Sequence, residues 1–142
     1  DFCYGRHEIN EMFKDIAYFR SLDVYGVVLG VLNDNNTVDI NLTNELVSAS
    51  GKLDVTFHKA IDSCDNILEE LRMIINNTEV SSILTSGGFK NAFAGHEIIK
   101  EMIKIAGKNI SIIAAGSITS ENILSLHELI EGKQYHGKRI VD

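Results

Sequence analysis

Short apolar segments alternate with amphipathic stretches along the whole chain, and this alternation constrains the fold more than any other feature. The apolar segments start roughly 25–30 residues apart, a spacing that suits βαβ units. Runs without polar alternation are typical of strands buried on both faces, as in parallel sheets. The predicted strands are Tyr25–Val31, Leu53–His58, Val80–Thr85, Ile110–Ala115 and, more weakly, Gln134–His136.

Helices are predicted between these strands, because apolar residues recur there at helical spacing. The predicted helices cover about 9–19, 42–49, 67–75, 98–106 and 123–130. Asn41, Asp65/Asn66 and Thr119/Ser120 are candidate N-caps, and Gly107 is a candidate helix terminator. The order α-β-α-β-α-β-α-β-α-β predicts parallel strands joined by right-handed crossovers.

Two α/β architectures compete for this pattern, an open doubly wound sheet and a TIM-type (β/α) barrel. The regular period and the lack of a G-x-G-x-x-G fingerprint favour the barrel. A complete barrel has about eight strands in about 250 residues. No linker divides the chain, so we expect residues 1–142 to form a single partial barrel domain with about five strands, the first strands being missing.

Composition narrows the possible partners and the location. The net charge is −7 and no extended basic patch is present, which argues against a nucleic-acid partner. No apolar run approaches the ~20 residues that cross a bilayer, so no membrane segment is expected. Two cysteines do not make a disulfide framework, and a reduced cytoplasmic location is expected.

Residues at the carboxyl ends of the predicted strands are the first candidates for chemistry, because barrel sites form there. His58 ends the second strand and is suited to proton transfer, although a structural role at the strand end is an alternative. Asp62 follows four residues later and could act with it as a second catalytic group. His136 ends the last strand and would lie near the same pocket.

Two glycine-containing turns could bind an anion. Ser86 and Gly87 follow the third strand, and Gly116 follows the fourth. Backbone N–H groups in such turns can hold a phosphate, especially before a helix N-terminus. The competing explanation is plain turn geometry.

Cys3 and Cys64 are the candidate metal ligands, since thiolates favour Cu(I). The competing interpretation is two ordinary thiols, because free cysteine usually behaves as a small buried hydrophobe. No H-E-x-x-H or C-x-x-C motif is present, so a preformed zinc site is not expected.

Several motifs together resemble one known family. They are DFCY at 1–4, GVVLGVL at 26–32, VDINLTNELV at 38–47, VTFHKAID at 55–62, ILTSGG at 83–88, IIAAGSI at 112–118 and YHG at 135–137. In this order they resemble the CutC family over nearly the whole chain. The resemblance implies a TIM-type barrel, a cytoplasmic location, a homo-oligomer and a role in copper homeostasis.

The resemblance also implies positions for the site. The implied pocket residues are Asp1, Phe2, Tyr4, Thr56, His58, Asp62, Ser86, Gly87, Gly116 and His136. Cys3 and Cys64 become the natural thiolate ligands of a copper ion, Cu(I). The sequence departs from the family at Lys59, where arginine is usual, and at Gly88, where glutamine is usual. The first three strands of the family barrel have no counterpart here.

Three functions stay open at this point, and they leave undecided whether the chain is an enzyme. The first is a CutC-type copper homeostasis protein that binds copper ions in the cytoplasm. The second is a barrel enzyme that acts on a small anionic or phosphorylated metabolite, with His58 as the acid/base. The third is a truncated, inactive relative. An incomplete barrel exposes two sheet edges, so we expect an oligomeric or aggregation-prone chain.

Overall fold

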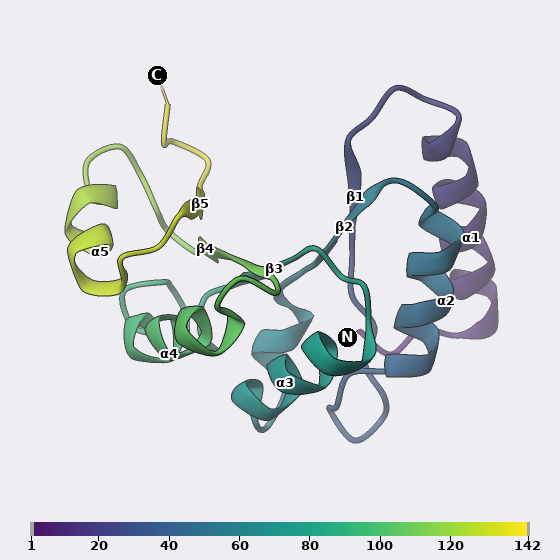
Figure 1. The fold of residues 1–142 in the computed structure, drawn as a ribbon, viewed down its shortest axis with the longest axis horizontal. Coiled ribbons are helices and arrows are strands. Elements are labelled where there is room, and N and C mark those ends of the chain that lie inside the picture. The colour runs from purple at the N-terminus through teal and green to yellow at the C-terminus, as the bar shows by residue number, and fades with distance from the viewer. Residues whose placement is uncertain (1, 142) are drawn as a thin grey trace.

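The computed structural model describes residues 2–141 and consists of strands that alternate with helices (Figure 1). The strands are β1 (Gly26–Leu29), β2 (Asp54–Phe57), β3 (Ser82–Thr85), β4 (Ser111–Ala115) and β5 (Gln134–His136). The helices are α1 (Arg6–Arg20), α2 (Ile40–Ser50), the 3₁₀ helix η1 (Lys59–Ser63), α3 (Ile67–Asn77), α4 (His96–Ala106) and α5 (Ile123–Ile130).

The strands form one parallel sheet in the order β1-β2-β3-β4-β5, so each strand pairs with its neighbours in sequence. A doubly wound sheet would reverse its strand order at a switch point, and this sheet does not. The predicted α/β barrel architecture is therefore confirmed, as an open segment of a barrel. In the described part of the chain, β1 and β5 are its two edges.

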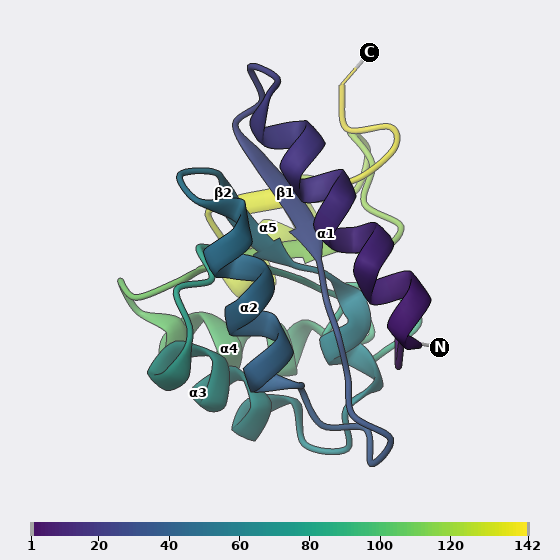
Figure 2. The same cartoon turned by 90° about the vertical axis from the view of Figure 1, so that its right-hand side faces the viewer.

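The helices line the outer side of the sheet, and each packs against the next from α1 to α5. Figure 2 shows α1 and α2 covering the β1–β2 end of the molecule. Alternation along β2 sets which side chains meet the helices: Val55 and Phe57 are buried, whereas Thr56 between them is half-buried. The inner face of the sheet, to which Thr56 belongs, has no helix layer in the described residues.

Local hydrogen bonds explain where the helices begin. The Asp39 side chain accepts from the Leu42 N–H and caps α2, so the prediction of Asn41 as the cap was wrong. Asn66 caps α3 as predicted. Asn122 is the N-cap position of α5, which corrects the prediction of Thr119/Ser120. The Asn122 side chain makes no capping hydrogen bond to the helix and instead binds the turn that precedes it.

Candidate ligand-binding site at the carboxyl ends of the strands

The five strands are parallel, so their carboxyl ends and the loops that follow lie at one edge of the sheet. His58 comes directly after β2, Ser86 after β3 and Gly116 after β4, while His136 ends β5. The structure thus brings these four predicted site residues to the same end of the sheet. The geometry at each strand end differs, and it decides what each residue can do.

The His58 imidazole is held in one orientation at the end of β2. Its Nδ1 accepts a hydrogen bond from the Ala60 N–H at 3.1 Å, so in the neutral ring the proton is on Nε2. The Phe2 ring lies 5.0 Å away, centroid to centroid. Burial lowers the pKa of His58, although a backbone hydrogen bond partly opposes the shift. The imidazole is therefore neutral at pH 7.

Gly30 makes room for this imidazole. A Cβ atom on Gly30 would lie 2.5 Å from His58 Nδ1 and 3.2 Å from the Ala60 Cβ. Any side chain at position 30 would displace the ring or the start of η1. Gly30, which follows β1, is therefore needed at the site because the absence of a side chain leaves room for the His58 ring.

Asp62, the predicted second catalytic group, binds the β3–α4 loop. Its carboxylate accepts hydrogen bonds from the Ser86 N–H at 2.9 Å, from the Gly88 N–H at 3.0 Å and from the Thr85 hydroxyl. Lys59 Nζ lies 3.6 Å from Oδ2, and the Asp62 side chain is only 10% exposed. No hydrogen bond joins Asp62 to His58 within residues 2–141.

The turn at Ser86 and Gly87 was predicted to bind an external anion. In this structure its donors are bound within the chain, those of Ser86 by Asp62 and that of Gly87 by Thr85. The Ser86 hydroxyl lies 2.9 Å from Asp62 Oδ2, and the Gly87 N–H donates to Thr85 Oγ1 at 2.8 Å. The carboxylate of η1 therefore takes the place that a bound anion would need. Its role here is to hold the loop after β3 against the segment after β2.

The other predicted pocket residues differ in their surroundings. Thr56 lies on the inner face, where its hydroxyl shares a 2.7 Å hydrogen bond with Ser82. Phe2 and Tyr4 pack against the core, and burial raises the pKa of Tyr4, with a smaller contribution from Glu8. Asp1 lies outside the described residues.

The two cysteines have different environments. Cys64 is buried, and burial followed by the charges of Glu70, Asp65 and Asp62 raises its pKa to about 12. The Cys3 thiol is half-buried and donates to the Asn33 carbonyl at 3.2 Å. Among residues 2–141 no three His, Cys, Asp or Glu side chains gather closely enough to hold a metal ion. A protonated Cys64 is a poor copper ligand, since the thiolate is the form that binds metals.

A cavity of about 520 Å³ lies where β4 and β5 end. Its lining includes His136 and Gly116, both predicted, together with residues that sequence reasoning had not placed in the site. Lys59, Lys138 and Arg139 are the basic ones among them. The sequence signal was the short basic cluster 133–139, whose position at a strand end only the fold reveals.

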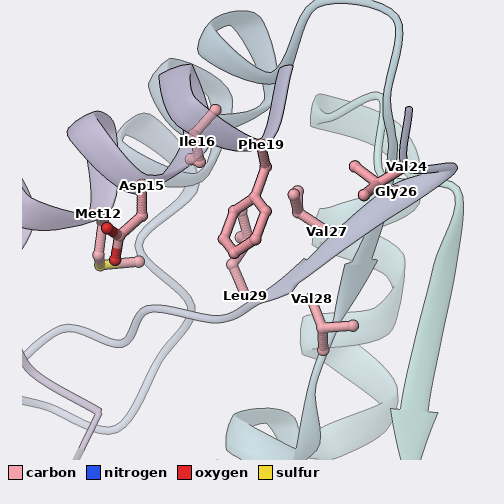
Figure 3. Close-up of a pocket in the computed structure, with 9 residues that line it drawn as sticks. All are labelled: Met12, Asp15, Ile16, Phe19, Val24, Gly26, Val27, Val28 and Leu29. Carbon is pink, nitrogen blue, oxygen red and sulfur yellow. The ribbon is translucent and has the colours of Figure 1, made fainter. Parts of the chain in front are cut away.

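A second cavity, of about 400 Å³, lies away from the strand ends, between α1 and the outer side of β1. Figure 3 shows Ile16 and Phe19 of α1 facing Val27 and Leu29 of the strand. This cavity borders the unpaired edge of β1 and has one charged lining residue, Asp15. It holds no polar cluster suited to chemistry.

Comparison with known proteins identifies the relatives of this chain. The sequence profile described as the CutC family matches residues 1–141. A CutC family protein of Histophilus somni is 33% identical over 136 residues, which cover 96% of this chain and 56% of that protein. One from Yersinia pestis is 38% identical over 117 residues, covering 82% of this chain and 46% of the relative. The chain thus spans about half the length of these curated relatives.

A solved structure agrees with the sequence matches. The crystal structure of a CutC protein from Streptococcus agalactiae, named for a role in copper homeostasis, superposes with a TM-score of 0.92 at 27% identity. The superposition covers 99% of this chain and 69% of that one.

No helix in residues 2–141 has the length and apolar character needed to span a bilayer.

Proposed function

Because the chain belongs to the CutC family, we propose that it is part of a copper homeostasis protein that binds copper ions in the cytoplasm. The observation that carries this proposal is the family match over residues 1–141. The chain also supplies two thiols, the side chains that Cu(I) prefers. Cell fractionation with an antibody against the chain would test the cytoplasmic location.

The two thiols are not equivalent in this proposal. Copper must displace the proton of a thiol, and the raised pKa of Cys64 makes that displacement costly at neutral pH. Cys3, which is half-buried where Cys64 is buried, is therefore the more accessible ligand of the two.

Anaerobic Cu(I) titration of the wild type, Cys3→Ser, Cys64→Ser and the double variant tests this assignment. We expect Cys3→Ser to weaken binding at pH 7 and Cys64→Ser to have its larger effect at alkaline pH. Unchanged stoichiometry and affinity in the double variant would remove the cysteines from the copper-binding role.

A second candidate function is an enzyme that acts on a small anionic metabolite with His58 as the acid/base. The observation that favours it is the oriented, neutral imidazole at the strand ends. A neutral histidine can accept a proton at pH 7, which general-base catalysis requires. Asp62 then serves as a positioning residue, because its oxygens already bind the β3–α4 loop.

His58→Asn tests the enzymatic candidate, since an asparagine oxygen can still accept from the Ala60 N–H and keep η1 in place. We expect turnover of a panel of phosphorylated and carboxylated metabolites, followed by NMR, to be lost while the fold is retained. Equal turnover in the variant would exclude His58 as the acid/base. No turnover and no copper binding by the wild type would leave the inactive relative as the remaining function class.

A further inference from the structure

The cavity at the ends of β4 and β5 has an unusual charge for this chain. Lys59, Lys138, Arg139 and the imidazole of His136 line it, and none of its lining residues is acidic. The whole chain carries a net charge of −7. A concentration of cations in a concave site on an acidic chain favours an anionic ligand there.

The cations differ in how free they are to bind. Lys59 already lies 3.6 Å from Asp62, so part of its charge is neutralised. Lys138 and Arg139 are exposed, and neither forms a salt bridge with another residue of the described chain. The guanidinium of Arg139 can donate two parallel hydrogen bonds to an oxyanion.

Ser117 and Ile118, in the loop after β4, also line this cavity and contribute backbone N–H groups to its wall. Gly116 and Ser117 have φ values of 109° and 56°, so the chain turns sharply as it leaves β4 beside the cavity. Within residues 2–141, the N–H groups of Ser117 and Ile118 donate no hydrogen bond. The equivalent donors after β3 are already bound to Asp62.

The loop is held in place before any ligand arrives. Thr119 and Arg139 form a parallel bridge, and the Ser120 N–H donates to the Arg139 carbonyl at 2.8 Å. The Asn122 side chain binds the Ser117 carbonyl and the Thr119 N–H, both at 2.9 Å. A preorganised set of donors loses little conformational entropy on binding.

We propose that this cavity binds the phosphoryl group of a small phosphorylated metabolite. Arg139 and Lys138 neutralise its charge, and the Ser117 and Ile118 N–H groups bind its oxygens. A phosphoryl group fits because it offers several acceptor oxygens and a double negative charge to this many donors. The proposal rests on the second candidate function. Of the two turns predicted to bind an anion, it selects the one at Gly116, after β4, over the one at Ser86 and Gly87, after β3.

Direct binding measurements test the proposal without requiring turnover. Calorimetric titration with inorganic phosphate and with glycerol 3-phosphate, at fixed ionic strength, would be run on the wild type, Arg139→Gln, Lys138→Gln and Lys133→Gln. Lys133 is the matched control, because it belongs to the same basic cluster but does not line this cavity. Amide chemical shifts of Ser117 and Ile118 would locate the ligand.

We expect Arg139→Gln to weaken binding of the ester by roughly tenfold, with Lys133→Gln unchanged. Equal losses in both variants would show attraction to overall charge and overturn the site. Unchanged chemical shifts of the Ser117 and Ile118 amides on addition of the ester would also overturn the site. If inorganic phosphate bound as tightly as the ester, the proposal that the ligand is a metabolite would be overturned. His58→Asn should still bind the ester, so failure of the catalytic role is distinguishable from failure of this site.

Discussion

At the scale of single residues, Asp62 shows how a buried carboxylate can organise a site without reacting in it. It connects η1 to the loop after β3 through the Ser86 and Gly88 amides. Both donors would lose their partner if the carboxylate were removed, and the loss is costly at Ser86, which is buried. Asp62 therefore fixes the distance between two strand ends that carry candidate ligand-binding groups.

Asp62→Asn is expected to destabilise the chain by about 2 kcal/mol, because the amide turns an NH₂ donor toward the donors of Ser86. Urea denaturation measures the loss, and hydrogen exchange should accelerate at the Ser86 and Gly88 amides. Asp65→Asn is the matched control, since that carboxylate is exposed. Equal stabilities of the two variants would contradict the role assigned to Asp62.

The lowered pKa of His58 leads us to expect that the free energy of unfolding depends on pH. The His58 pKa is lowered in the folded chain, so the unfolded chain binds more protons at acidic pH. Stability is then fully present above the unfolded pKa of about 6.5 and falls as the pH drops toward the folded value. We expect His58→Asn to show a shallower fall in this window, measured by urea denaturation at a series of pH values. Parallel pH profiles would contradict the prediction.

At the scale of elements, the strand cores could be predicted because each is an uninterrupted apolar run. Burial on both faces was expected for these runs, yet only the helix-facing side is covered in the described chain, and Val28 of β1 is 63% exposed. The predicted strands were longer than the observed ones, β5 excepted. Tyr25 was placed in the first strand, yet it precedes β1 and is 97% exposed. Val31 lies beyond the end of β1 and is buried, so apolar burial extends past the last paired residue of the strand.

The site was less predictable than the strands. Glycines after β3 and β4 indicated turns, but they could not reveal that a carboxylate from η1 occupies one of them. That contact joins residues 26 apart in sequence, and η1 itself has no periodic apolar signal. Local patterns predict local structure, whereas the partner of a donor is set by tertiary packing.

Glu70 fixes the segment between β1 and α2 to α3. Its side chain is buried, at 8% exposure, and accepts the Val38 N–H at 2.9 Å. We expect Glu70→Ala to destabilise the chain by about 2 kcal/mol and Glu70→Gln, which keeps an acceptor oxygen, by less. Thermal unfolding measures both, with the exposed first-turn Glu97→Ala as control. A loss no greater than that of Glu97→Ala would contradict the anchoring role.

At the scale of the whole molecule, the open sheet leaves β1 and β5 with unpaired edges in the described chain. Unpaired strand edges can pair with other chains. Beside the β1 edge, Tyr25 is 97% and Val28 63% exposed, which adds apolar surface to the free backbone groups. We propose that chain 1–142 associates with itself through these edges.

Val28→Lys should reduce that association, because a lysine on an edge strand opposes pairing with another strand. Sedimentation velocity at several protein concentrations measures the effect. Met73→Lys, which places the same charge on the exposed surface of α3, is the control and should associate like the wild type. A monomeric wild type at every concentration would exclude self-association.

The sequential strand order has a consequence for how such a chain can change over evolutionary time. In the described sheet, every strand is flanked only by strands that are adjacent to it in the sequence. Duplicating or deleting one strand–helix module therefore requires no rethreading of the others. Each surviving module keeps its own loop at the same end of the sheet, so the candidate ligand-binding loops can be gained or lost one at a time.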